Sequence, residues 1–281
     1  MKVAIASGKG GTGKTTVSTN LAFVAAQSER KVHLLDCDVE EPNCHIFVKP
    51  QIETTEKVFI PVPEVDLDKC TGCGECAEIC QFNAIVNIKG SVLTFPEMCH
   101  GCGGCWLVCP EKAISVGSRE VGVLEHGTAF NFQFTQGRLR IGETMSPPLI
   151  RKVKASQNNA DLTIIDSPPG TSCPVIAAIR GCDFVILVTE PTPFGLNDLI
   201  LAVEMVRVLD IPFFVLINRA DIGDDRVREY CQRKAIPILL EIADDRSVAE
   251  AYSRGEMAAS AIPQFRDTFD QIISSLEDSV I

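Results

Sequence analysis

Eight of the 13 cysteines lie between positions 70 and 109. They form the pattern C-x2-C-x2-C-x3-C twice, at Cys70, Cys73, Cys76 and Cys80 and at Cys99, Cys102, Cys105 and Cys109. Thiolates bind iron–sulfur clusters, and three thiolates spaced two residues apart can bind three corners of one cubane, whereas the fourth cysteine typically binds the neighbouring cluster. The pattern therefore predicts two 4Fe-4S clusters, one on Cys70, Cys73, Cys76 and Cys109, the other on Cys99, Cys102, Cys105 and Cys80.

Zinc is the alternative metal for a cysteine-rich segment. Structural zinc sites usually pair two cysteines with a second, more distant pair, and they need no third cysteine at the same short spacing. Glycines such as Gly72 and Gly101 allow tight turns that aim backbone N–H groups at sulfur. Residues 66–117 resemble bacterial two-cluster ferredoxins, so we expect clusters. Gln81 stands where the second unit has Pro110, and we expect a looser turn there without loss of a ligand.

A glycine-rich loop near the N-terminus has the residues of a phosphate-binding site. The stretch S-G-K-G-G-T-G-K-T at 7–15 contains G-x-x-x-x-G-K-S/T, between a strand-like run and a helical segment. Loop N–H groups can cradle phosphate oxygens there, and the helix N-terminus adds favourable partial charge. Lys14 is expected to reach the β- and γ-phosphates, and Thr15 to bind Mg²⁺. The predicted nucleotide-binding residues of this loop are Gly8, Gly10, Gly11, Thr12, Gly13, Lys14, Thr15 and Thr16.

Lys9 indicates which kind of P-loop this is. The run K-G-G-T-G-K-T at 9–15 resembles the deviant P-loop of the superfamily of MinD, ParA and the nitrogenase iron protein. The stretches D-C-D at 36–38 and D-S-P-P-G at 166–170 match further motifs of that superfamily. The resemblance implies weak, dimer-dependent ATP hydrolysis, in which Lys9 reaches the partner's phosphates across a nucleotide-sandwich dimer.

The same resemblance assigns roles to residues that follow the strands. Asp38 would orient the attacking water, Asp166 would hold Mg²⁺, and Gly170 would sense the γ-phosphate. Aspartates at the carboxyl ends of parallel strands line the usual ligand crevice, which agrees with these roles. Asp36 has two interpretations, as a site carboxylate or as one that caps a turn.

The base-binding end of the site depends on Asn218. This residue ends the apolar run 213–218, where proteins of the superfamily place an asparagine on adenine. The stretch N-R-A-D at 218–221 also resembles the guanine motif N-K-x-D, with Arg in place of Lys. The superfamily resemblance favours ATP over GTP, and by resemblance alone it places residues 189–193 at the dimer face.

Apolar runs that alternate with helical segments must position these residues. The runs lie at 2–6, 32–36, 162–166, 184–190, 213–218 and 236–240, and helical segments lie at 15–27, 148–157, 195–209 and 225–234. This alternation predicts an α/β P-loop NTPase fold with a mostly parallel central sheet. Turns in 122–142 predict hairpins. We predict a discontinuous ATPase domain at 1–60 and 118–281, interrupted by a small α+β ferredoxin-like domain at 61–117.

Composition excludes some classes of function. The net charge of −11 disfavours electrostatic binding to nucleic acid. The chain has no apolar run of about 18 residues and no signal-peptide pattern, so we expect a cytoplasmic protein that does not span a membrane. Thiols stay reduced in that compartment, so the cysteines are not expected to form a disulfide framework.

Three functions fit these observations. The preferred one is an ATP-binding, weakly hydrolysing protein that couples nucleotide state to electron transfer, as a homodimer or a heterodimer with a paralogous ATPase, and with a redox or cofactor-assembly partner. A carrier of iron–sulfur clusters would need a labile, exposed cluster, and the C-x-x-C pair that some cluster-transferring relatives use is absent from residues 118–281. A spatial regulator like MinD would need a basic C-terminal helix, but residues 265–281 are acidic.

The five cysteines outside the repeat are expected to be small buried residues. Cys173 lies seven residues after Asp166, a distance similar to that of a ligand of the bridging cluster in the nitrogenase iron protein. That protein uses a second, earlier ligand, and no cysteine lies between Cys109 and Cys173 here. The other four are Cys37, Cys44, Cys182 and Cys231.

Overall fold

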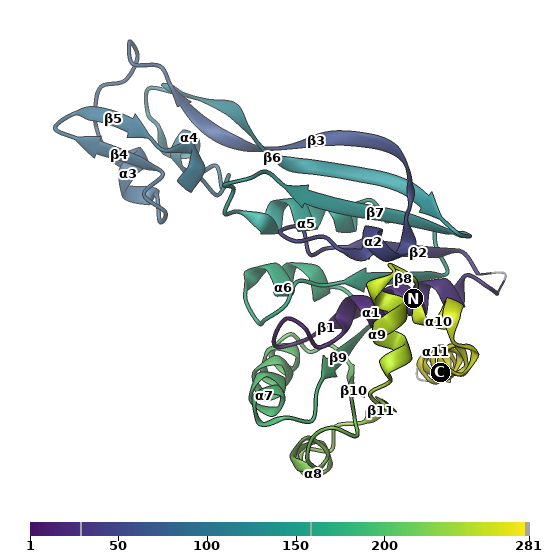
Figure 1. Ribbon diagram of the computed structural model, residues 1–281. Coiled ribbons are helices and arrows are strands. Elements are labelled where there is room, and N and C mark those ends of the chain that lie inside the picture. The colour runs from purple at the N-terminus through teal and green to yellow at the C-terminus, as the bar shows by residue number, and fades with distance from the viewer. Residues whose placement is uncertain (29, 158, 279–281) are drawn as a thin grey trace.

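One large sheet organises the computed structural model, which describes residues 1–28, 30–157 and 159–278 (Figure 1). Its strands are β1 (Lys2–Ala6), β2 (Val32–Asp36), β3 (Gln51–Val65), β6 (Ile114–Ala129), β7 (Phe132–Leu139), β8 (Leu162–Asp166), β9 (Phe184–Thr189), β10 (Phe213–Asn218) and β11 (Ile238–Ile242). They lie in the order β11-β10-β9-β1-β8-β2-β7-β6-β3. Neighbours from β11 to β7 pair parallel, and β6 pairs antiparallel with both β7 and β3. The mostly parallel sheet predicted from the sequence is confirmed.

Helices cover both faces of this sheet. The helices of the described residues in this part of the chain are α1 (Lys14–Ala25), α2 (Cys44–Val48), α5 (Ser146–Ala155), α6 (Cys173–Ile179), α7 (Pro193–Val208), α8 (Arg226–Arg233), α9 (Arg246–Ser253), α10 (Ala258–Ala261) and α11 (Pro263–Asp278). One apolar core joins the sheet to α5, α6, α7 and α8, and another joins it to α1, α2, α10 and α11. No helix in the described ranges is long and apolar enough to cross a membrane.

Strand direction brings the predicted site residues to one edge. Because β1, β2, β8, β10 and β11 run parallel, the loops that follow them meet at their carboxyl ends. Strand β3 runs in the same direction, since it is antiparallel to β6 and β6 is antiparallel to β7. The chain therefore enters the cysteine-rich segment from the same edge of the sheet.

The cysteine-rich segment forms a lobe at the end of a two-stranded ribbon made by β3 and β6 (Figure 1). The lobe contains α3 (Glu75–Ile79), the hairpin of β4 (Ile85–Ile88) and β5 (Ser91–Thr94), a 3-10 turn (Pro96–Met98) and α4 (Gly104–Val108). The sequence does not predict a strand as long as β3, because prolines usually interrupt strands. Pro61 and Pro63 are tolerated because β3 lies at the edge of the sheet, where β6 is its one partner among the described strands.

Removing a large side chain from the core under α11 tests this packing. Phe269 is fully buried, and Phe269→Ala is expected to lower the free energy of unfolding by about 3–5 kcal/mol, through lost burial and the cavity left behind. Phe194 is 79% exposed, so Phe194→Ala is expected to change the free energy of unfolding by less than about 0.5 kcal/mol. Denaturant unfolding of both variants measures the difference, and equal costs would contradict the packing described here.

Candidate nucleotide site and cysteine pockets

The glycine-rich loop joins β1 to α1 and borders an open cleft with about 1350 Å³ of empty space. Gly13 stands just before α1 with a φ of 98°, a left-handed conformation that favours glycine. Lys14 opens the helix, and its burial lowers the pKa of its amine against the opposing effects of Asp166 and Asp38. Of the predicted nucleotide-binding and catalytic residues, those that line the cleft are Gly10, Gly11, Gly13, Lys14, Thr15, Thr16, Asp38 and Asn218.

Asp166 is the centre of a buried hydrogen-bond network beside this cleft. Its carboxylate accepts hydrogen bonds from the hydroxyls of Thr15 at 2.8 Å and Ser18 at 2.6 Å, and from the Cys44 thiol at 3.4 Å. The Thr15 hydroxyl also lies 2.8 Å from Asn43 Oδ1, although it has only one proton to share between two acceptors. Oxygen atoms in excess of protons suit a hard cation, so this donor set fits Mg²⁺.

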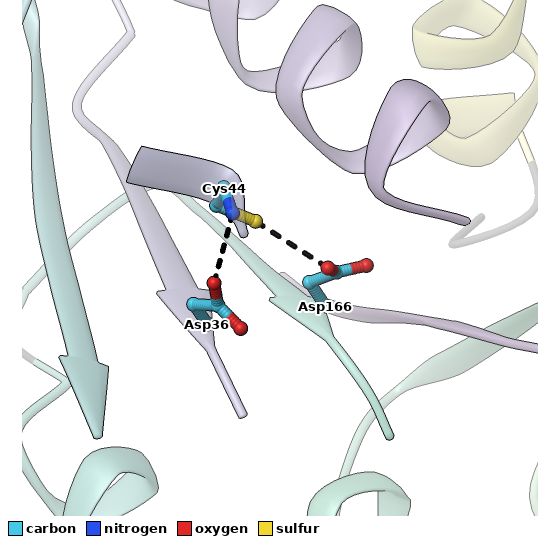
Figure 2. Close-up of side chains that lie close together, drawn as sticks. All are labelled: Asp36, Cys44 and Asp166. Carbon is cyan, nitrogen blue, oxygen red and sulfur yellow. Dashed lines mark hydrogen bonds between the residues drawn. The ribbon is translucent and has the colours of Figure 1, made fainter. Parts of the chain in front are cut away.

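Asp36 caps a turn. Its carboxylate accepts hydrogen bonds from the backbone N–H groups of Asp38 at 3.1 Å, Asn43 at 3.1 Å and Cys44 at 3.0 Å. Figure 2 shows Asp36 and Asp166 on either side of Cys44, and single ligand atoms of these three residues lie within 4.8 Å of one another. Because the Asp36 oxygens are already used by backbone N–H groups, the turn-capping interpretation of this residue holds.

Asp38 and Gly170 lie on the loops that follow β2 and β8. Burial and the nearby Asp166 raise the pKa of Asp38 to about 6, while Lys14 acts in the opposite direction. Gly170 has a φ of 97° and donates its N–H to the Ser7 carbonyl at 3.0 Å, which ties this loop to the phosphate-binding loop. The roles of both residues toward a γ-phosphate stay predictions.

Lys9 lies outside the set of residues that line the cleft. Its amine forms an ion pair with Glu190 at 3.4 Å, and Glu190 also pairs with Arg219 at 2.7 Å. The Lys9 side chain is 31% exposed, and its role toward a partner stays a prediction. Within one chain, the geometry directs Lys9 toward this acidic residue and not into the cleft.

The end of the cleft at Asn218 contains residues that the sequence analysis did not predict. Asn218 donates from Nδ2 to the Thr12 carbonyl at 2.9 Å. The cleft is also lined by residues from the 242–252 segment, among them Asp244 and Tyr252. The signal was available, because this segment follows the carboxyl end of β11 and Asp245 caps α9 through the Ser247 N–H. Asn43 and Ser18 were missed because short hydroxyl and amide side chains carry no distinctive spacing.

The two cysteine units have nearly the same local geometry. Helices α3 and α4 begin at equivalent positions, and the equivalent glycines Gly74 and Gly103 have φ angles of 92° and 81°. Cys80 Sγ and Cys109 Sγ each accept an N–H hydrogen bond at 3.3 Å from the residue four positions later. The turn at Gln81 therefore matches its proline-containing equivalent, and the expectation that it would be looser is wrong.

The eight cysteines line two separate pockets. The first contains Cys70, Cys73, Cys76 and Cys109, and the second contains Cys80, Cys99, Cys102 and Cys105. Their empty volumes are about 340 and 350 Å³. The fold thus brings the cysteines together in the two groups that the sequence predicts, each with one cysteine from the other unit. Cluster binding itself stays a prediction, and this donor set of thiols with backbone N–H groups fits 4Fe-4S clusters.

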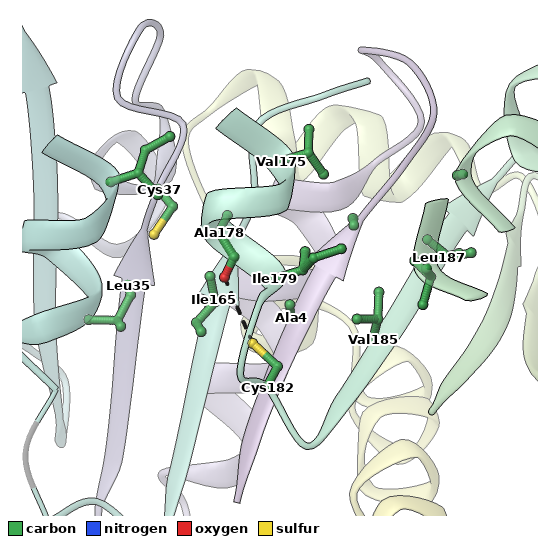
Figure 3. Packing of buried hydrophobic residues seen from close by; sticks show 14 of the residues in the cluster. Ala4, Leu35, Cys37, Ile165, Val175, Ala178, Ile179, Cys182, Val185 and Leu187 are labelled. Carbon is green, nitrogen blue, oxygen red and sulfur yellow. Dashed lines mark hydrogen bonds between the residues drawn. The ribbon is translucent and has the colours of Figure 1, made fainter. Parts of the chain in front are cut away.

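The remaining cysteines are of two kinds. Cys37, Cys44, Cys182 and Cys231 are buried as expected, and Figure 3 shows Cys37 and Cys182 among apolar side chains. Cys173 is exposed at the start of α6, so the expectation that it is a buried apolar residue is wrong.

The fold and the cleft define a P-loop nucleotide-binding protein. Residues 3–258 match the model of the family described as the CobQ/CobB/MinD/ParA nucleotide binding domain. This match covers most of the sequence, and the chain belongs to that family.

Relatives extend this assignment. An uncharacterized protein of Methanocaldococcus jannaschii is 36% identical over 222 residues, which is 78% of each chain. An iron-sulfur cluster carrier protein of Aquifex aeolicus is 26% identical over 90% of this chain and 60% of its own length. The septum site-determining protein MinD of Pyrococcus horikoshii, solved with Mg-ADP, has a TM-score of 0.63 at 19% identity and covers 99% of this chain and 96% of its own. The likeness to MinD establishes the P-loop ATPase fold.

Substituting Gly13 tests the geometry of the phosphate-binding loop. A Cβ at Gly13 would lie 2.5 Å from Asn218 Nδ2, so Gly13→Ala is expected to displace Asn218 and weaken MgADP binding by roughly tenfold, about 1.4 kcal/mol. Gly181 has a similar left-handed φ of 78° and no neighbour within 4 Å of such a Cβ. Gly181→Ala is therefore the matched control for backbone strain. Calorimetric titration compares the two variants, and equal affinities would show that the close approach to Asn218 is unimportant.

Proposed function

We propose that this protein is an ATP-binding, slowly hydrolysing P-loop ATPase that couples its nucleotide state to electron transfer through two 4Fe-4S clusters. The observation that carries the proposal is the grouping of eight cysteines into two four-cysteine pockets on a lobe joined to a nucleotide cleft. We assign this lobe, residues 61–117, to a ferredoxin-like domain, and residues 1–60 and 118–281 to the ATPase domain. When bound, such clusters carry single electrons.

The nucleotide would be held by residues of the cleft. Lys14 neutralises phosphate charge, the loop N–H groups bind phosphate oxygens, and Thr15 and Asp166 hold Mg²⁺. Asp38 lines the cleft, where it orients the attacking water. Asp221 is the aspartate of the stretch that resembles the guanine motif. Its carboxylate accepts the Asp244 N–H at 2.6 Å and Asp221 does not line the cleft, which favours ATP over GTP.

A packed path joins the two parts of the protein. The loop after Asp166 leads into α6, which packs against α5, and α5 packs against β6 and β7. Strands β3 and β6 continue without interruption into the lobe. Movement of the 166–170 loop with nucleotide would therefore reach the lobe through helices and strands that are already in contact. Such coupling requires that the nucleotide bind two arrangements with different affinities.

Hydrolysis would require a dimer. Lys9, 31% exposed and paired with Glu190, precedes the loop residues that line the cleft, and a second copy or a paralogous ATPase would place its phosphates there. A redox protein or a cofactor-assembly protein would then exchange electrons with the lobe.

Cluster delivery is the second candidate function. It is favoured by relatives named iron-sulfur cluster carrier proteins in Aquifex aeolicus and Pyrococcus abyssi, at 26% and 25% identity, and by the exposure of Cys73 and Cys102. Against it, residues 118–281 contain three cysteines, Cys173, Cys182 and Cys231, and none are two residues apart. A spatial regulator is disfavoured because α11 carries one arginine and four acidic residues.

Removal of the Lys9 amine tests the dimer role. We expect Lys9→Ala to lower the rate of ATP hydrolysis by about tenfold or more, about 1.4 kcal/mol in barrier height, with iron content and MgADP affinity unchanged. Lys234→Ala, at an exposed site outside the cleft, should hydrolyse ATP at the original rate. The double variant Lys9→Ala/Glu190→Gln checks the ion pair: if it recovers full hydrolysis, Lys9 serves only to neutralise Glu190 within one chain.

An anaerobic redox titration followed by electron paramagnetic resonance tests the coupling. Two cubane signals are expected, and MgATP should shift at least one potential relative to MgADP by about 60 mV, which for one electron is a tenfold change in equilibrium. Potentials that are indifferent to nucleotide would count against coupling inside the protein and favour cluster delivery. Zinc in place of iron would overturn the proposal.

A further inference from the structure

Arg119 is a buried cation at the junction of the lobe and the ATPase domain. It lies on β6, is 8% exposed, and forms an ion pair with Glu143, whose side chain is 1% exposed. The ion pair uses one nitrogen, Nη1. Within the described part of the chain, Nε and Nη2 are buried without a hydrogen-bond partner. Such donors are costly to leave unpaired, so a structural ion pair alone does not account for this residue.

Cys99 is the predicted cluster ligand that lies near Arg119. Arg119 pairs with Ile60 across the ribbon, and the Cys99 thiol lies 3.9 Å from the carbonyl oxygen of the adjacent Pro61. Ile60 and Cys99 share the core that covers one face of the sheet. Burial and Arg140 lower the pKa of Arg119, whereas Glu97 and Cys99 favour its charged form. The guanidinium remains charged at neutral pH, and Arg119 lies outside the residues that line the pocket of Cys99.

The two pockets therefore differ in their electrostatic surroundings. The pocket of Cys70 is lined by its cysteines, by uncharged residues and, among the described residues, by one carboxylate, that of Glu111. No carboxylate lines the pocket of Cys99 among the described residues, and this cysteine is buried, whereas the equivalent Cys70 is partly exposed. Net charge, hydrogen bonds to sulfur and exposure set the potentials of iron–sulfur clusters. A cation beside one pocket and an anion beside the other should separate the two potentials.

We propose that Arg119 is a positioning residue for electron transfer, whose buried charge makes the site of Cys80, Cys99, Cys102 and Cys105 easier to reduce than the other site. This inference rests on the proposed function, since it presumes that both pockets bind clusters. One electron from an external one-electron donor adds one negative charge at this site, and no covalent bond forms or breaks. Arg119 stabilises that added charge by Coulomb attraction in a medium that screens poorly.

Glu143 determines how much of this charge reaches Cys99. Its Oε1 accepts hydrogen bonds from the N–H groups of Thr144 and Met145, at 3.0 and 2.9 Å, directly before α5 begins. Arg140 lies 3.9 Å from the same carboxylate. The counter-ion of Arg119 is thus fixed to the N-terminus of a helix of the ATPase domain. Neutralising Glu143 should therefore have the opposite effect to neutralising Arg119.

Reduction potentials of the whole protein, measured by anaerobic titration with dithionite and electron paramagnetic resonance, test the proposal. Arg119→Gln is expected to lower the higher potential by at least a tenfold change in equilibrium, which is 59 mV for one electron. Glu143→Gln is expected to raise that same potential. Glu111→Gln is expected to raise the lower potential and so identifies the signal of the Cys70 pocket.

Lys57→Gln is the matched control, because Lys57 pairs with Glu120, the residue next to Arg119, at 2.8 Å and is 65% exposed. It should leave both potentials unchanged. If Arg119→Gln loses its clusters, Arg119→Lys retains the charge without the guanidinium fork and should keep the two potentials apart.

The outcomes separate the two proposals. Absence of cubane signals from the unaltered protein would overturn the proposed function. Two signals that Arg119→Gln leaves unmoved, or shifts equally, would overturn the role of Arg119 alone. The same holds if both Arg119→Gln and Arg119→Lys lose clusters while Glu143→Gln leaves the potentials in place, because Arg119 would then serve only to hold the fold together.

Discussion

The Asp166 carboxylate is the interaction on which the nucleotide site depends. It lies at the carboxyl end of a central strand, and it is bonded to Thr15 and Ser18 in the first turns of α1 and to Cys44 at the start of α2. Burial raises its pKa, and the hydroxyl donors and Lys14 counter this. The helix that carries the phosphate-binding loop and the loop after β2 are thereby held to one acidic group. An enclosed carboxylate with oxygen atoms of Thr15 and Asn43 close by has the donor set that suits the proposed Mg²⁺.

Much of this arrangement could be read from the sequence, since the residues concerned combine fixed spacing with a required backbone direction. Lys14, Thr15 and Asp166 follow buried strands, so a parallel sheet brings them to one edge. Asp36 shows where this reasoning stops. An aspartate after a strand has the same local pattern whether it faces a ligand or caps a turn, and only the path of residues 38–44 places three N–H groups against it. The 242–252 segment carries no motif, and its place after the carboxyl end of β11 is the signal from which it could have been predicted.

The repeat in the lobe was predictable for a different reason. Cysteine spacing fixes which turns can form, so Gly74 and Gly103 take the same left-handed conformation and the two short helices begin at equivalent positions. Cys80 and Cys109 each line the pocket of the other unit. This follows from the longer spacing between each of them and the three cysteines that precede it in its own unit. The difference between the pockets does not follow from the repeat. It arises from the ribbon, where Pro61 and Arg119 lie against one unit and not the other.

The ribbon of β3 and β6 joins the lobe to the large sheet through packed side chains. A flexible linker would let the lobe turn independently, whereas the apolar core of the sheet continues through Ile60 and Val62 to Cys99. Cys99 is therefore packed into the core of the large sheet, whereas Cys76 and Cys105, one from each pocket, share a small separate core within the lobe. Packed interfaces resist gradual deformation, so we expect a displacement of this core to reach Cys99 and its pocket.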